Sequence, residues 1–316
     1  MKFRCERDVL TEAVSTAGRA AASRGGALPV LSGVRVELAG NRLTLTGSDL
    51  DLTISVSVTV NGESDGLAVI PAKLASDIVR ALEPGAVSFE VVDDEVRITS
   101  GRSDFSLRLI PADEFPHLAE AAGDAVTLSA ADFSAALHQV VPAASADDSR
   151  PILTGVLLAA EESGLRLVAT DSYRLAVRDL PGTSVLAEGQ SVLVPSRALG
   201  ELGRLLGDAE SVTLRLGERD ASFEIDEVRL STRLIEGEFP NYRGLIPASH
   251  PNRLTVGREV LLDAVRRVRL MARESTPVRM VMKPDSLELL AVTQDVGQAH
   301  EELDASFDGT ELTVAF

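Results

Sequence analysis

One pattern of residues is written twice in the chain, about 125 positions apart, and this repetition limits the fold more than any other feature. The pattern reads RLIPADEFPHL from Arg108 and RLIEGEFPNYRGLIP from Arg233. Upstream of each, LPVLSGVRVELAGNRLTLTGSDLDL from Leu28 matches RPILTGVLLAAEESGLRLVATDSYRL from Arg150. Self-similarity at a domain-sized spacing is typical of arrays of one structural unit. The chain is therefore expected to be built from copies.

A third, shorter copy begins near residue 253. There, RLTVGREVLLDAVRRVRLMAR matches KFRCERDVLTEAVSTAGRAAA from Lys2 and VTLSAADFSAALHQVVPAAS from Val126. The final residues, TELTVAF, take the place of QSVLVP in the second copy, so about half of a third unit is present. The repeats therefore predict three domains, the third incomplete, over residues 1–119, 125–249 and 252–316.

Hydrophobic periodicity predicts the elements of each copy. Strict alternation of apolar and polar residues predicts strands, and apolar residues at helical spacing predict helices. The dipeptides Asn61-Gly62 and Asp93-Asp94 are expected to form hairpin turns. In the first copy, the expected strands are 2–6, 30–38, 42–48, 51–60 and 67–71, with further strands to residue 110, and the expected helices are 8–22 and 72–82.

The third copy predicts one amphipathic helix over 258–273. Its apolar side chains recur at helical spacing, so we expect them to face the core. Together these patterns predict an α+β fold in which each complete copy packs two helices on antiparallel sheets. The residues of the third helix expected to face inward are Val260, Leu261, Ala264, Val265, Val268, Met271 and Ala272.

Composition indicates a reducing, aqueous compartment. The single cysteine, Cys5, excludes an internal disulfide. The N-terminus carries no signal-peptide pattern, and the chain contains no apolar run of 18 residues. We therefore expect a cytoplasmic protein. Because hydrophobic residues make up 45% of the chain and aromatic residues only 3%, the cores are expected to be aliphatic.

The basic and acidic residues are not spread evenly along the chain. A formal charge of −17 disfavours a nucleic-acid partner if it is spread evenly. The five expected helical spans 8–24, 71–83, 129–145, 195–206 and 258–273, however, hold 11 of the 31 basic residues and only 8 of the 48 acidic residues. The helices could share one surface that faces a polyanion, although exposed helix faces often carry arginine without any ligand. No aromatic residues alternate with the basic ones, which favours phosphate contact without base reading.

These segments together resemble the bacterial sliding clamp, the beta subunit of DNA polymerase III. The motifs that carry the resemblance are MKFRCERDVL, LPVLSGV, SGRSDFSLRLIPADEFPHL, LVATDSYRLAV and RLIEGEFPNYRGLIP, in the family's order across all 316 residues. The resemblance implies a head-to-tail homodimeric ring that encircles duplex DNA, with helices lining the hole and sheets outside. A ring of this kind tethers the replicative polymerase and needs only weak, sequence-independent attraction to DNA.

The resemblance also implies three sets of site residues. A pocket for short linear motifs of polymerase and clamp-loader subunits involves Leu153, Thr170, Ser172, Tyr173, Arg174, Leu175, Pro240 and Leu245. In this pocket the leucines and Pro240 would form an apolar socket, and Arg174 and the Thr170 hydroxyl would orient the peptide. The interface between the two protomers of the ring involves Phe105 and Leu107 of one protomer with Leu270 and Met271 of the other. The expected DNA-facing residues are Arg24, Lys73, Arg80, Arg150, Arg197, Arg204, Arg266, Arg267, Arg269 and Arg273.

The family continues for roughly another half-domain beyond TELTVAF. Burial of a Leu- or Met-sized side chain stabilises a fold by ~1.5–3 kcal/mol, so the loss of several partners can exceed marginal stability. From this we expect these 316 residues alone to have a loosened third domain and to close rings poorly.

A catalytic site is the main alternative to the sliding-clamp interpretation. GESDG, which contains Ser64, matches the nucleophile pattern Gly-x-Ser-x-Gly, but it is followed by a predicted strand rather than by a helix. The four histidines lack the spacing of metal ligands. We therefore expect no catalytic residue, no metal and no cofactor. Two alternatives stay open: a repeat scaffold that never touches DNA, and, less favoured, a hydrolase that uses Ser64.

Overall fold

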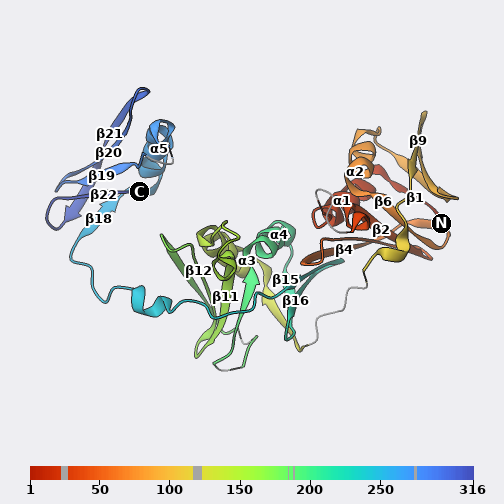
Figure 1. The fold of residues 1–316 in the computed structure, drawn as a ribbon, viewed down its shortest axis with the longest axis horizontal. Coiled ribbons are helices and arrows are strands. Elements are labelled where there is room, and N and C mark those ends of the chain that lie inside the picture. The colour runs from red at the N-terminus through yellow and green to blue at the C-terminus, as the bar shows by residue number, and fades with distance from the viewer. Residues whose placement is uncertain (23–27, 117–122, 184, 188, 274–275) are drawn as a thin grey trace. The chain divides into compact units, whose positions relative to one another are not determined.

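The computed structural model describes residues 1–316 except 23–27, 117–122, 184, 188 and 274–275. The chain divides into two compact units, Met1–Pro240 and Asn241–Phe316 (Figure 1). The first unit holds two complete repeats, and the second unit holds the third repeat. Within the described part of the chain, no helix combines the length and the apolarity needed to span a bilayer.

The two repeats of the first unit follow the same order of elements. The first repeat comprises β1 (Lys2–Glu6), α1 (Arg7–Gly18), β2 (Gly33–Ala39), β3 (Arg42–Ser48), β4 (Leu52–Thr59), β5 (Asn61–Ser64), β6 (Gly66–Pro71), α2 (Ala72–Ala81), β7 (Ala86–Val92), β8 (Glu95–Ser100) and β9 (Ser103–Arg108). The second repeat comprises β10 (Ala125–Ser129), α3 (Ala130–Val140), the 3₁₀ turn η4 (Pro151–Thr154), β11 (Gly155–Glu161), β12 (Gly164–Thr170), β13 (Leu175–Pro181), β14 (Ser191–Pro195), α4 (Ser196–Leu206), β15 (Ser211–Leu216), β16 (Asp220–Ile225) and β17 (Val228–Arg233).

One antiparallel sheet runs through both repeats. Its order is β10-β15-β16-β17-β4-β3-β2-β6, and the joint between the repeats is the pairing of β17 with β4. A row of facing residues crosses this joint: Gly47 lies opposite Ile54, Ile54 opposite Leu230, and Leu230 opposite Phe223. The two repeats therefore share one sheet and one hydrophobic core.

Helices of both repeats cover the same face of this sheet. A Cβ on Gly47 would lie 2.0 Å from the carbonyl oxygen of Ala17 in α1, so the helix backbone packs directly on the sheet there. At the other end of the row, the Phe223 ring stacks on Phe133 of α3 with centroids 6.2 Å apart. Because alternate residues of a strand point to opposite faces, the neighbouring positions form an open, polar face. On it, the hydroxyls of Thr46 and Ser55 are hydrogen-bonded at 2.9 Å.

The third repeat forms a separate core. Its elements are η5 (Tyr242–Leu245), β18 (Arg253–Val256), α5 (Arg258–Val268), η6 (Arg269–Met271), β19 (Arg279–Met282), β20 (Ser286–Thr293), β21 (Gly297–Asp308) and β22 (Leu312–Ala315). Its sheet has the order β18-β21-β20-β19-β22. The fully buried residues of this core are Ala264, Val268, Leu287, Leu289 and Ala291.

The structure corrects three predictions of local structure. Asn61-Gly62 does not form a turn but begins β5, which pairs with β1. Gly62 is needed for close approach, because a Cβ there would lie 1.8 Å from the carbonyl oxygen of Gly40. The first helix ends at Gly18 rather than at residue 22, and α5 ends at Val268 in a 3₁₀ turn. The predicted turn at Asp93-Asp94 is confirmed, between β7 and β8.

Val260 does not face the core as predicted, since 53% of its surface is exposed. Val260 lies in the first turn of α5, one turn before Ala264, the first buried residue of this helix. The other residues predicted to face inward on this helix are buried or pack partly buried against the core.

Candidate functional site

The loop between β12 and β13 is held in one conformation by its own side chains. The Asp171 carboxylate accepts hydrogen bonds from the backbone N–H groups of Tyr173 and Arg174, both at 2.9 Å. The Thr170 hydroxyl accepts the N–H of Ser172 at 3.1 Å and donates to the carbonyl of Arg174 at 2.7 Å. Ser172 has a φ of 79°, a left-handed conformation that costs energy for a residue other than glycine. The loop is therefore preorganised.

Electrostatics reinforce this loop. Desolvation acts to raise the pKa of Asp171, but hydrogen bonds from the Tyr173 and Arg174 N–H groups, with the Arg174 guanidinium, outweigh it and lower that pKa. The guanidinium Nε lies 3.0 Å from the Asp171 carboxylate. The loop consequently presents a carboxylate paired with Arg174, and the neighbouring Tyr173 side chain is 93% exposed.

The Thr170 hydroxyl, predicted to orient a peptide, is hydrogen-bonded within its own loop. Only 5% of the residue is exposed, and the hydroxyl makes its hydrogen bonds to its own loop. Thr170 shapes the backbone that carries Tyr173 and Arg174, because a buried hydroxyl is satisfied by the groups nearest to it.

Two of the predicted apolar pocket residues, Leu153 and Leu175, lie on the elements that flank this loop. Leu153 is half-buried in η4, and its carbonyl accepts the N–H of Ser145 at 2.8 Å. Arg150 ties η4 to the loop, donating to Asp147 at 3.0 Å and to the Ser172 hydroxyl at 3.4 Å. Leu175 begins β13 directly opposite Thr170.

The chain that leads to Pro240 passes against the same 3₁₀ turn. A Cβ on Gly237 would lie 2.8 Å from Ile152, so Gly237 permits this close approach. Pro240 itself is exposed and is the last residue of the first unit. Leu245 lies in η5 of the second unit and is also exposed.

A hairpin loop occurs at this place in all three repeats, with four residues between the last paired positions in the first two and three in the third. One residue of each loop has positive φ: Leu50 (81°), Ser172 (79°) and Asp295 (61°). In the first repeat, the Asp49 carboxylate accepts a hydrogen bond from Arg197 of α4 at 2.5 Å. In the second repeat, the corresponding Asp171 is paired with its neighbour Arg174 instead. Only the second loop therefore exposes an aromatic and a cationic side chain together.

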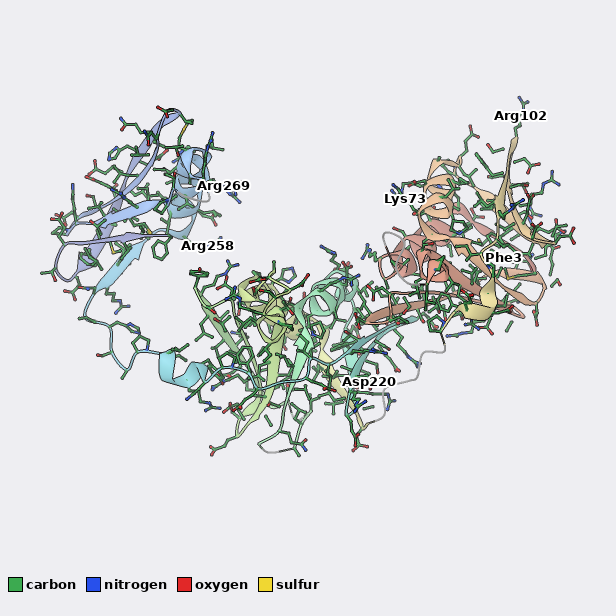
Figure 2. All side chains as sticks on the ribbon, in the orientation of Figure 1. Phe3, Lys73, Arg102, Asp220, Arg258 and Arg269 are labelled. Carbon is green, nitrogen blue, oxygen red and sulfur yellow. The ribbon has the colours of Figure 1, made fainter. Side chains whose placement is uncertain are left out.

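The predicted DNA-facing residues fall into two classes. Several are paired with carboxylates: Arg197 with Asp49, Arg204 with Glu201, Arg266 with Asp263 and Arg267 with Glu301. Others are exposed without a carboxylate within 4.0 Å among the described residues, namely Lys73, Arg80, Arg269 and Arg273. Figure 2 shows the labelled Lys73 and Arg269 side chains at the surface of their respective units. Arg24 lies outside the described residues.

Sequence reasoning missed an ionic cluster that joins the first two repeats. Arg19, at the end of α1, lies 4.0 Å from Glu201 of α4, and Glu201 is also paired with Arg204. The helical spacing of Glu201 and Arg204 could have revealed the second contact. Nothing in the sequence indicates the first contact, because it depends on how β4 and β17 join.

The predicted interface residues differ in accessibility. On β9, Phe105 is 38% exposed whereas Leu107 is only 6% exposed and packs in the core of its own domain. On η6, Leu270 is 75% exposed and Met271 is half-buried. Phe105 and Leu270 are therefore the members of this set that a second copy could cover most fully.

The residues considered for catalysis or metal binding are not brought together. Ser64 is the last residue of the exposed strand β5 and pairs with Lys2, and β6 begins two residues later. This is not the strand-to-helix turn that activates a nucleophilic serine. Among the described residues, no group of three His, Cys, Asp or Glu side chains could hold a metal ion.

Comparison with known proteins places the whole chain in one family. Residues 1–119, 127–241 and 243–316 match the N-terminal, central and C-terminal domains of the DNA polymerase III beta subunit. The beta sliding clamp of Streptomyces coelicolor is 36% identical, with 100% of this chain and 85% of that protein covered. The beta sliding clamp of Micrococcus luteus is 33% identical over 98% of this chain and all of that protein.

Solved structures agree with the sequence comparison. A sliding clamp from Bartonella birtlesii bound to griselimycin is 30% identical, with a TM-score of 0.92 over 100% of this chain and 87% of that one. The DNA polymerase sliding clamp from Bacillus subtilis is 31% identical, with a TM-score of 0.89 at the same coverage. The chain therefore belongs to the family of bacterial beta sliding clamps, the non-catalytic processivity subunits of DNA polymerase III.

Proposed function

We propose that, in the complete form of its family, this chain encircles duplex DNA as a head-to-tail homodimeric ring. In this form it tethers the replicative polymerase and other DNA-processing proteins without reading the DNA sequence. The ring acts in the cytoplasm, and its domains are those predicted over 1–119, 125–249 and 252–316. The observation that carries the proposal is the placement of helices from two repeats on one face of a shared sheet, with polar residues on the other.

The helix face has the charge that a sliding contact needs. Lys73 and Arg80 lie on α2 as exposed cations, and Arg269 and Arg273 do so at and after η6. A few unpaired cations give weak, salt-dependent attraction to phosphates. Pairing of Arg197 and Arg267 with carboxylates lowers the total attraction, which favours sliding over fixed binding.

The loop Thr170–Leu175 is the proposed docking point for partner peptides. Its side chains are held in place before a ligand arrives, which lowers the entropy cost of binding. Tyr173 offers a large exposed ring, and Arg174 offers a cation beside it. The solved clamp from Bartonella birtlesii has griselimycin bound, and we place the corresponding ligand of this chain at Leu153, Leu175, Pro240 and Leu245. Polymerase and clamp-loader subunits would supply it as short linear motifs.

Retention on DNA of different topology tests the ring. The chain would be loaded onto nicked circular DNA, and half of the sample would then be cut once with a restriction enzyme. A ring is retained on the circle and lost from the linear form by sliding off the ends. Equal retention on both forms would contradict encirclement. A repeat scaffold that does not act on DNA would be retained on neither form.

A further inference from the structure

The exposed side of α4 carries one carboxylate between two arginines. Arg197, Glu201 and Arg204 recur at helical spacing, on the side of the helix away from the buried Leu199 and Leu202. The side chain of Glu201 is only 15% exposed, whereas those of Arg197 and Arg204 are 59% and 66% exposed. A ligand that approaches this helix therefore meets the cations before it meets the carboxylate.

The two oxygens of the Glu201 carboxylate have different surroundings. Oε1 accepts a hydrogen bond from Arg204, one turn later on the same helix. Oε2 lies 4.0 Å from Nη1 of Arg19, which follows α1 in the first repeat, and this distance is too long for a hydrogen bond. Oε2 is buried and has no hydrogen-bond partner among the described residues. Such an oxygen disfavours the folded state, so stability of the fold does not explain it.

The unpaired oxygen gives Glu201 a second arrangement within reach. A movement of about 1 Å brings Nη1 of Arg19 within hydrogen-bond distance of Oε2. Arg204 can then leave the carboxylate without leaving it unpaired. Of the two arginines, Arg204 is the more exposed, at 66% against 39% for Arg19, so it is the one that an approaching anion reaches first.

The first repeat carries the same charge pattern without this pairing. In sequence, AKLASDIVRA of α2 matches SRALGELGRL of α4. The three charged positions correspond in order, Lys73, Asp77 and Arg80 in α2 to Arg197, Glu201 and Arg204 in α4. Asp77 is exposed and has no Lys or Arg nitrogen within 4.0 Å among the described residues, and Arg80 donates to the Ser76 hydroxyl at 3.5 Å instead. The cation of this pattern is therefore held by a carboxylate on α4 and not on α2.

Two glycines keep the surface of α4 low beside Glu201 and Arg204. They are Gly200 and Gly203, and a Cβ at either position would meet no described atom within 4 Å. Packing within the chain therefore does not require glycine there, although glycine inside a helix is less stable than alanine. A bulky ligand benefits from the missing side chains, because it can approach Arg204 closely.

We propose that Glu201 is a positioning residue that withholds Arg204 from DNA until a backbone phosphate takes it, and that Arg19 then replaces Arg204 on the carboxylate. The inference rests on the proposed function and names the residue that limits the attraction of the joint between the repeats for DNA. Arg204 exchanges a carboxylate for a phosphate, so the net gain of each contact is small. Contacts of small net gain are broken easily, which favours sliding over fixed binding.

Binding of the full chain to a short fluorescent duplex, measured by anisotropy over a series of low salt concentrations, tests the inference without a closed ring. Glu201→Gln keeps the shape of the side chain and releases Arg204. Affinity should rise by roughly 1.5- to 5-fold, the strength of an ordinary exposed ion pair. The slope of log affinity against log salt should steepen by about 0.9 for the added phosphate contact. A purely structural role of Glu201 predicts no such gain.

Asp77→Asn is the matched control. It removes the same charge at the equivalent position of the first repeat but releases no arginine, so the salt slope should not change. Circular dichroism would verify folding of both variants, and Glu201→Ala should show the same gain as Glu201→Gln. Equal slopes for the Glu201 and Asp77 variants would overturn the inference and leave DNA contact standing. Absence of binding by every variant, at every salt concentration, would overturn both.

Double substitutions test which arginine is exchanged. Arg204→Gln combined with Glu201→Gln should cancel the gain in affinity and in salt slope, because no released cation remains. Arg19→Gln should weaken binding while Glu201 is present, since the carboxylate then has no replacement partner, and should have much less effect beside Glu201→Gln. A gain that survives Arg204→Gln, or an effect of Arg19→Gln that is the same with and without Glu201, would overturn the exchange.

Discussion

Arg197 of α4 donates a hydrogen bond at 2.5 Å to the carboxylate of Asp49, a residue 148 positions earlier in the chain and in the other repeat. Asp49 also accepts the N–H groups of Asp51 and Leu52 at 3.1 and 2.8 Å. One carboxylate thus shapes the loop after β3 and binds the neighbouring repeat. The equivalent carboxylate in the second repeat, Asp171, is bound to Arg174 of its own loop rather than to a neighbouring repeat.

Loss of this contact should weaken the joint between repeats modestly. Arg197→Ala should lower the free energy of unfolding of the first unit by about 0.2–1 kcal/mol, since the arginine is largely exposed. Urea denaturation followed by circular dichroism would measure the change. Asp49→Asn should cost more, because Asp49 also fixes its own loop. If the two substitutions together cost the sum of the single effects, the contact does not couple the repeats.

The apolar residues around the second loop should dominate peptide binding. Leu153→Ala or Pro240→Ala should each weaken binding of a polymerase-derived peptide by ~2 kcal/mol, as is typical of residues central to a docking site. Calorimetry would measure the affinity, and circular dichroism would verify folding. Leu67→Ala, at an exposed leucine of the first repeat, serves as the control and should bind normally. Unchanged affinity in both pocket variants would remove this assignment.

Thr170 should act through the shape of the loop. Thr170→Val leaves the N–H of Ser172 and the carbonyl of Arg174 without their partner. A buried polar group without a partner costs about 1–3 kcal/mol, so stability and peptide affinity should both fall. Thr170→Ser keeps the hydroxyl and should restore most of each property. Normal stability and affinity in Thr170→Val, with losses in Thr170→Ser, would mean that the methyl group, rather than the hydroxyl, matters.

The Asp171 carboxyl should stay ionised at lower pH than an ordinary aspartate. Because its pKa is lowered in the folded chain, its contribution to stability is present above the unfolded pKa of about 3.9 and is lost as the pH falls through the folded value. Carboxyl NMR titration would report the shift. Arg174→Ala should move the pKa toward the ordinary value, whereas Arg178→Ala on β13 should leave it unchanged.

Arginines without a carboxylate partner among the described residues should contact DNA more strongly than paired ones. Arg269→Glu and Arg273→Glu should reduce retention equally on unrelated DNA sequences and flatten its salt dependence, by a slope of about 0.9 for each lost phosphate contact. Arg267→Glu should have an effect as well, but it would also break the pairing with Glu301. Arg253→Glu on β18 is the matched control of equal charge change. A loss confined to one DNA sequence would contradict phosphate contact.

The sequence by itself determined the repeats, the class of most elements and the family. Alternation in RLTLTGSD predicts β3 because a strand with one buried face must alternate, and that rule needs no knowledge of its partner. The same holds for α4, whose apolar residues recur at helical spacing. Recurrence of whole segments then identified the pocket loop and the strand β9 as repeated parts.

Only the tertiary structure decided which copy of a repeated loop binds the neighbouring repeat and which binds only its own residues. Asp49 and Asp171 have equivalent local hydrogen bonds, yet one binds Arg197 across the joint and the other binds its neighbour. The sequence predicts a ligand contact at Thr170, whereas in the structure its hydroxyl is hydrogen-bonded within its own loop. Asn61-Gly62 reads as a turn but becomes a strand, because β1 offers its backbone an antiparallel partner. Periodicity fixes the face on which a side chain lies, whereas the identity of its neighbour depends on how strands distant in sequence are brought together.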